Sequence, residues 1–154
     1  MEKFSGFLWI QYRRDECKTP IQFSYISEFC LCLLNPGCIA SLGMEDGAIS
    51  DAQITASSQW DDNHSPERAR LNTKLVGIKR GGWSSRPCDL NQWLQVDLGT
   101  YTIVTRVATQ GRNGHDQWVT SYRIEYGNDG VNFHFYREPG DSSPKVTLLR
   151  QLFF

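Results

Sequence analysis

The first stretch with the chemistry of a binding site is "WDDNHS". It holds an aromatic side chain followed by four polar ones, Trp60, Asp61, Asp62, Asn63 and His64. Carboxylates accept hydrogen bonds from vicinal hydroxyls, and an amide both donates and accepts. An aromatic ring beside them can stack on a sugar, enter a bilayer or fill a protein pocket. The alternatives are a solvated polar turn and a tryptophan that folds back onto the protein. Asn63 also begins a glycosylation sequon, although the proline after the sequon disfavours its use.

A second candidate is "GRNGHDQ", residues 111–117, in which two glycines allow a sharp turn that projects Arg112. The planar guanidinium suits a carboxylate, sulfate, phosphate or pair of hydroxyls. The alternative is an ion pair between Arg112 and Asp116 or another loop acid. His115 and Asp116 are weaker candidates for the same site. Lys79 and Arg80 are either solvated or part of a cationic rim that attracts anionic head groups.

Other chemistries find no support in the sequence. Sixteen basic and 17 acidic residues give a net charge of -1, so no basic excess supports nucleic-acid binding. Neither a Gly-x-Ser-x-Gly elbow, a His-Glu-x-x-His motif nor a phosphate loop is present, which predicts a protein that is not an enzyme. No cofactor is expected, and calcium is not indicated. The cysteine spacing is not that of a zinc site, and an odd number leaves at least one thiol unpaired within the chain. The cysteines are Cys17, Cys30, Cys32, Cys38 and Cys88.

Short alternating runs must position these polar stretches. Strands are predicted around 93–98, 103–109, 118–126 and 131–137, and "GNDG" is predicted to be a hairpin turn. In the third run Trp118, Tyr122 and Ile124 share the inward face, with Arg123 and Glu125 on the other. The pattern favours an antiparallel all-β sandwich with one wet face per sheet. The intervals 57–72, 74–92 and 111–117 are then its functional loops.

The N-terminal segment fits this pattern less well. "FSGFLWI" is apolar, but charged residues follow it at once, whereas a signal peptide carries its positive charges first. Residues 1–37 are therefore predicted to be a poorly ordered leader. No run approaches 18 apolar residues, so no transmembrane segment is predicted.

Several long motifs occur in the order of one known family. "CIASLGMEDGAISDAQITASSQW", "ARLN", "GGWSS", "NQWLQVDLG", "TQGR" and "QWVTSYRIEYGNDGVNF" resemble discoidin domains, also called coagulation-factor type C domains. The resemblance implies an eight-stranded jelly roll that binds glycans, anionic phospholipids, collagen or protein receptors through loops at one end, without catalysis. It also implies an extracellular or cell-surface location. It places Trp60 and Arg112 in those loops, and Trp83 and Trp93 in the core.

The resemblance covers residues 38–146 and departs from the family at both ends. The closing strands and cysteine of the family do not follow, and "TLLRQLFF" forms a divergent tail over 147–154. The family's disulfide would join Cys38 to that absent cysteine. A chain without these strands is expected to be aggregated or molten, and a non-functional fragment is one alternative reading.

Among ligands, the sequence favours glycans at a cell surface or in the matrix, including glycoproteins. The stretch "QGRNGHDQWVTSYRIEY" resembles the slime-mould lectins of the family, and only Trp60 appears as an exposed apolar loop residue. Anionic phospholipid or protein-receptor binding is the runner-up. A basic residue at Arg80 disfavours collagen, because collagen-binding members tend to be acidic there. One tryptophan gains roughly 4–6 kcal/mol gross on burial, so weak binding is expected, strengthened by multivalency or a larger parent protein.

Overall fold

The structure is a computed structural model that describes residues 4–13, 22–26, 41–86, 89–102, 104, 107–119 and 121–148. All five cysteines fall outside these ranges. The prediction that Cys38 has no partner therefore lies outside the described residues.

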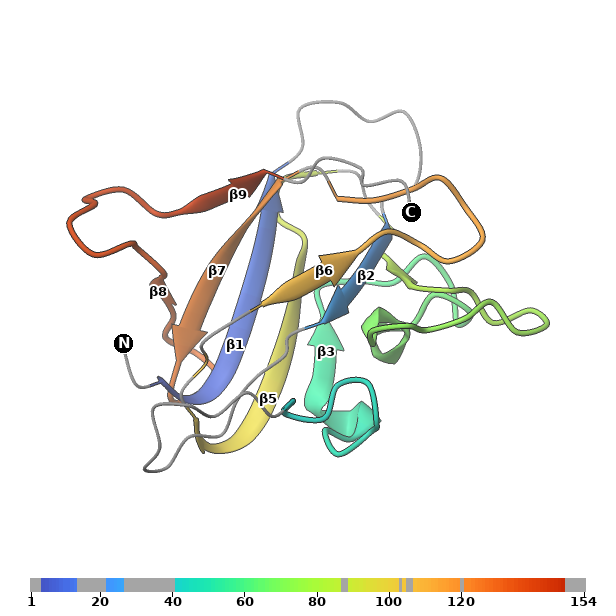
Figure 1. Ribbon diagram of the computed structural model, residues 1–154, viewed down its shortest axis with the longest axis horizontal. Coiled ribbons are helices and arrows are strands. Elements are labelled where there is room, and N and C mark those ends of the chain that lie inside the picture. The colour runs from blue at the N-terminus through green and yellow to red at the C-terminus, as the bar shows by residue number, and fades with distance from the viewer. Residues whose placement is uncertain are drawn as a thin grey trace.

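Two antiparallel sheets form the fold (Figure 1). The larger sheet has the order β3 (Ile54–Ala56), β5 (Trp93–Thr102), β1 (Phe4–Arg13), β7 (Ser121–Gly127) and β8 (His134–Phe135), and β9 (Val146–Leu148) also pairs with β7. The smaller sheet has the order β4 (Trp83–Ser84), β2 (Gln22–Ile26) and β6 (Ala108–Gln110). Two single-turn 3-10 helices, η1 (Asp51–Gln53) and η2 (Pro66–Ala69), complete the elements of the described residues. The all-β prediction is confirmed.

Alternation of apolar residues explains why the central strands form. In β5, Leu94 and Val96 are 1% and 3% exposed, and Gln95 between them is only half-buried. Ile54 of β3 lies opposite Val96 in the register and is buried as well. A period of two places such side chains on one face of the sheet, which is the face that carries the core. That core consists of Leu8, Ile10, Met44, Ile49, Ile54, Ala69, Trp83, Leu94, Val96, Val119 and Tyr122.

The N-terminal segment differs from its predicted role. The sequence predicted a poorly ordered leader over 1–37, whereas the structure places β1 at the centre of the larger sheet, between β5 and β7. Leu8 and Ile10 are each 3% exposed and belong to the core. The charges that follow "FLWI" argue against a signal peptide, but they do not prevent the alternating apolar residues from forming a strand. The boundary at residue 38 thus leaves out a strand of this sheet.

The last hairpin is shorter than predicted. Only His134–Phe135 pairs with β7 in place of the predicted strand 131–137, and Val131 is 78% exposed. The connection is the predicted turn: the Asp129 carboxylate accepts hydrogen bonds from the backbone N–H groups of Val131 and Asn132, at 2.9 and 2.7 Å. These and a third bond, from the Asn132 side chain, lower the pKa of Asp129 to about 2. Gly130 has a φ of +71°, which favours glycine.

Glu125 departs from the predicted alternation, because it is 4% exposed although it lies on the face expected to be wet. The reason is the pairing of β8, which places Phe135 opposite Glu125, with the Arg123 guanidinium 5.5 Å from the centre of the Phe135 ring. Burial raises the pKa of Glu125 to about 7, partly offset by the charge of Arg123. One of its carboxyl oxygens has no hydrogen-bond partner among the described residues.

Glu125→Gln is therefore expected to change the pH dependence of stability. The folded state holds the Glu125 proton up to a pKa of about 7, against an ordinary value of 4.5. Stability contributed by this proton is present below pH 4.5 and is lost as the pH rises to 7. The neutral glutamine removes this loss, so the variant should have the higher Tm at pH 8 and a similar Tm at pH 4.5. Thermal unfolding across this range measures the difference, and equal Tm curves at all pH values would contradict the buried state of Glu125.

Candidate functional site

Three loops meet at one end of the sandwich, and we call residues 60–65, 74–80 and 112–117 together the loop face (Figure 1). Backbone hydrogen bonds join them to one another and to the segment 81–85. The N–H of Trp60 donates to the carbonyl of Ser84 at 2.7 Å, and the N–H of Arg80 donates to that of Asn63 at 3.0 Å. The N–H of Asn113 donates to the carbonyl of Gly81 at 3.3 Å. The three loops thus share one support.

The support is the segment 81–85, "GGWSS", in which every residue is buried. Trp83 is completely buried, and its indole N–H donates to the carbonyl of Ser58 at 2.8 Å. A Cβ on Gly81 would lie 2.6 Å from the backbone oxygen of Asn113. The glycine is required because the loop 112–117 approaches the backbone too closely for any side chain.

A chain of polar contacts crosses the loop face. The Asp61 carboxylate lies 2.6 Å from Nδ1 of His64, and this bond is the main reason that the pKa of Asp61 is lowered. Nε2 of His64 lies 3.3 Å from Nη2 of Arg112. Nη1 of Arg112 donates to the side-chain oxygen of Gln117 at 2.7 Å. Side chains from two predicted site loops therefore form one cluster, which we call the polar cluster.

The guanidinium of the cluster is partly removed from water and lies near a second one, that of Arg80. Burial lowers the pKa of Arg112, and the nearby charge of Arg80 lowers it further. The charge of Arg112 in turn is the main cause of the lowered pKa of His115. Nε of Arg80 and Nε of Arg112 are buried and have no hydrogen-bond partner among the described residues. Two guanidinium groups with unpaired donors, beside the Asp61 carboxylate, can bind an anionic group or several hydroxyl oxygens at this end of the protein.

An apolar tip projects beside this cluster, formed by Leu75, Val76 and Ile78. Their exposed fractions are 40%, 68% and 73%. The tip is a tight turn, because Val76 and Lys79 exchange two backbone hydrogen bonds of 3.0 Å. The expectation that only Trp60 exposes an apolar side chain on the loops is therefore wrong. The missed signal was "KLVGIK", an apolar run with a central glycine and a lysine at each end, inside an otherwise polar interval.

The predicted site residues differ in exposure. Trp60 is 47% exposed, and the exposed polar ones are Asp61, Asp62, His115 and Asp116. Asn63, Arg80 and Arg112 are half-buried, whereas His64 is only 7% exposed. Lys79 is exposed, and its ammonium donates to the carbonyl of Asp62 at 2.9 Å. Of the tryptophans predicted for the core, Trp83 is buried, and Trp93 and Trp118 are half-buried.

Comparison with known proteins decides the family. The family model described as F5/8 type C domain matches residues 53–152. The chain belongs to the F5/8 type C domain family. No solved structure matches the chain.

Several curated proteins are similar to this F5/8 type C domain. It is 39% identical to bovine (Bos taurus) lactadherin over 123 residues, which is 75% of this chain and 28% of lactadherin. It is 38% identical to discoidin, CUB and LCCL domain-containing protein 2 of Rattus norvegicus over 127 residues, or 79% of this chain and 16% of that protein. It is 40% identical to retinoschisin of Takifugu rubripes over 103 residues, which is 63% of this chain and 36% of retinoschisin. The chain thus spans about a third or less of the length of these relatives.

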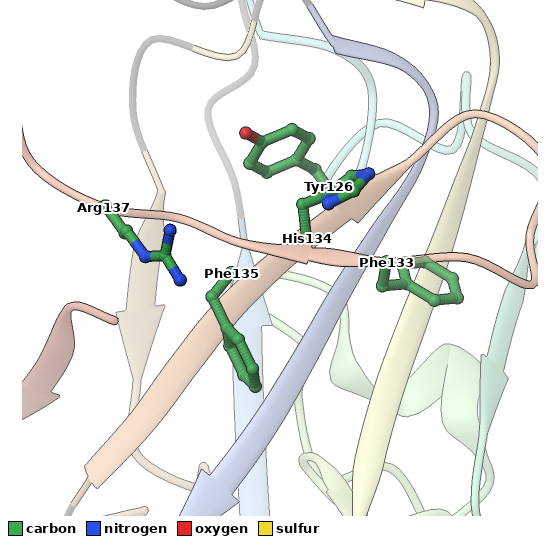
Figure 2. Close-up of a pocket in the computed structure, with 5 residues that line it drawn as sticks. All are labelled: Tyr126, Phe133, His134, Phe135 and Arg137. Carbon is green, nitrogen blue, oxygen red and sulfur yellow. The ribbon is translucent and has the colours of Figure 1, made fainter. Parts of the chain in front are cut away.

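A hollow lies on the β7–β8 hairpin, away from the loop face. It has a volume of about 280 Å³ and is lined by Tyr126, Phe133, His134, Phe135 and Arg137 (Figure 2). Figure 2 shows Tyr126 and His134 on one side of the β8 segment and Phe135 on the other, and the rings of Tyr126 and His134 are 6.1 Å apart. None of its lining residues was predicted from the sequence as a site residue.

Two further observations concern the described residues alone. None of their helices has the length and apolar composition needed to cross a membrane. They also contain no group of three or more His, Cys, Asp or Glu side chains that could hold a metal ion.

The two tryptophans Trp60 and Trp83 offer a matched test of this geometry. Trp83→Ala removes a completely buried side chain and should cost about 3–5 kcal/mol of unfolding free energy. Trp60→Ala removes a half-exposed side chain whose backbone N–H stays bonded, so we expect a cost of about 1 kcal/mol or less. Chemical denaturation of both variants measures the difference. Equal losses would mean that Trp60 is part of the core.

Proposed function

We propose that this chain is an extracellular, non-catalytic recognition module that binds anionic membrane surfaces through its loop face. Membership in the F5/8 type C domain family supports an extracellular binding module in general. The main support for the membrane proposal is the apolar tip, whose side chains are exposed to solvent. The tip consists of Leu75, Val76 and Ile78, and Lys74 and Lys79 flank it. Apolar side chains that are exposed together and rimmed by charge mark a surface that is buried in a partner.

The arrangement matches the two layers of a membrane surface. An aliphatic side chain gains about 1.5–3 kcal/mol when it is fully buried, so Val76 and Ile78 can drive insertion of the tip. Each lysine near an anionic leaflet adds about 1 kcal/mol. Trp60 is half-exposed on the neighbouring loop, and its amphipathic ring suits the head-group region.

The affinity of a single module should nevertheless be low. Association costs about 4–15 kcal/mol of lost rigid-body freedom, which offsets most of the gain from a tip of this size. Several modules on one surface would multiply the affinity without any new contact. The partial coverage of its relatives fits a module that acts within a longer protein.

Replacement of the tip tests this proposal. Val76→Asp with Ile78→Asp should reduce binding to phosphatidylserine-containing vesicles at least tenfold, because two inserting side chains become charged. Val131→Asp is the matched control, since Val131 is 78% exposed on the β7–β8 loop, away from the loop face. Co-sedimentation with vesicles measures both, with the Tm of each variant recorded to exclude unfolding.

The dependence of binding on salt measures how much of it is electrostatic. Binding of the wild-type chain should weaken as ionic strength rises above about 0.15 M, where the screening length falls below about 8 Å. Equal binding of the tip variant and the control variant would contradict the membrane proposal. The proposal would also be contradicted if the wild-type chain bound vesicles of phosphatidylcholine alone as well as it bound vesicles that contain phosphatidylserine.

Glycan binding is the second candidate, and the polar cluster favours it. The exposed carboxylates of Asp61 and Asp62 follow Trp60 in sequence, and His64 connects Arg112 to Asp61. An aromatic ring beside carboxylates and a guanidinium can stack on a sugar while the charged groups bind its hydroxyls. The sequence favoured this ligand class, and the cluster supports it.

Arg112→Met tests the glycan candidate. It should lower binding to galactose-type glycans about tenfold or more, because it removes the guanidinium of the cluster and keeps an unbranched side chain. Arg137→Met is the control, since Arg137 is exposed at the hollow on the β7–β8 hairpin. A glycan array in 0.15 M and 0.5 M salt measures both, and hydroxyl-based binding should survive the higher salt. No binding of the wild-type chain to any galactose-type glycan would contradict this candidate and leave the membrane proposal intact.

A further inference from the structure

The strand at the centre of the larger sheet comes from outside the region that defines the family. The family match begins at residue 53, whereas β1 spans Phe4–Arg13. Residues 14–53 separate the end of β1 from the start of β3. The sheet therefore combines one strand from the N-terminal segment with strands from the matched region.

β1 connects two halves of the sheet that have no other link among the described strands. It pairs with β5 on one side and with β7 on the other, antiparallel in both cases. β5 and β7 therefore run parallel to each other, with a slot the width of one strand between them. Without β1, the pair β3–β5 would be separated from β7 with its neighbours β8 and β9. Both sides of the slot would then expose unpaired backbone groups, which bind any suitable strand.

The side chains of β1 make the slot selective. Leu8 lies opposite Val96 of β5 and Tyr126 of β7, and Ile10 lies opposite Leu94 and Ile124. Both are 3% exposed, so they fill the core between the two strands. Gln11 is only half-buried, and its amide donates to the carbonyl of Leu90 at 3.4 Å. The slot thus accepts an extended segment with apolar side chains at positions 8 and 10.

We propose that β1 is an exchangeable strand, and that the slot between β5 and β7 binds the Phe4–Arg13 segment of a second copy of this chain. Backbone pairing does not depend on which molecule supplies the strand, and exchange of an identical element is a low-cost route to a dimer. The tether gives the chain's own β1 an effective concentration in the millimolar range, so dilute protein is monomeric. Refolding at high concentration allows reciprocal exchange. The resulting dimer carries two loop faces.

Complementation in trans tests the slot. The full-length Ile10→Lys chain has a defective strand and an intact slot, so its thermal transition should be lost or lowered. A fluorescent peptide of residues 4–13 with the wild-type sequence should co-elute with this chain and raise its Tm. The same peptide with Ile10→Lys should bind at least tenfold more weakly. Because the readout is a gain of folded protein, the test holds even where Ile10→Lys alone does not fold.

Co-refolding tests the second copy as occupant. Wild-type chains of two different masses, refolded together at high concentration, should yield mixed dimers by size exclusion with light scattering, and Ile10→Lys chains should yield none. The proposal would be overturned if the wild-type peptide did not bind at about 1 mM, the upper range of tether concentrations. Equal binding of the Ile10→Lys peptide, or a failure to form mixed dimers, would also overturn it. An unchanged Tm of the Ile10→Lys chain would also overturn the proposal, because β1 would then not be needed in the slot.

Discussion

The loop face depends on one buried piece of backbone, the segment 81–85. It accepts a hydrogen bond from Trp60 through Ser84 and one from Asn113 through Gly81, and so it connects two loops that are distant in the sequence. Trp83 anchors it in the core, and the absence of a side chain at Gly81 lets the loop 112–117 lie against it. The glycine at position 81 and the tryptophan at position 83 thus determine where the side chains of the loop face lie.

This support presents two different chemistries on the same end of the protein. The polar cluster is held by contacts between His64 and its neighbours Asp61 and Arg112, and it is partly withdrawn from solvent. The apolar tip is held by the backbone of its own turn and by a hydrogen bond of 3.0 Å from the Leu75 N–H to the Asn113 side chain, and its side chains stand exposed. A protruding apolar tip flanked by two lysines is suited to an interface between water and hydrocarbon, whereas a recessed polar cluster is suited to a small polar group. The two need not compete, because a sugar or head group bound at the cluster leaves the tip free.

The sequence was a good guide wherever one local rule decided the outcome. The alternation around 93–98 predicted the strand in which Leu94 and Val96 are buried, and the turn at Asp129 followed from the Asp-Gly pair. Prediction from the sequence failed where an element distant in the sequence determined the burial or pairing of a residue. Glu125 is buried because β8 folds over it, and β1 belongs to the sheet because β5 and β7 leave a slot that its alternating residues fill. The apolar tip was missed for another reason: its residues were read as part of a long polar interval, although the exposed turn could have been suspected from the central glycine.

Depth-dependent quenching of tryptophan fluorescence tests the membrane proposal most directly. Trp60 is half-exposed on the loop face, whereas Trp83 is buried in the core and inaccessible to lipid. Vesicles containing phosphatidylserine and lipids brominated on their acyl chains should quench part of the emission of the bound wild-type chain. That quenching should be absent in Trp60→Phe, which keeps an aromatic ring at the same position. Binding to these vesicles without any quenching that depends on Trp60 would contradict the account, because the loop face would then not be the surface that meets the membrane.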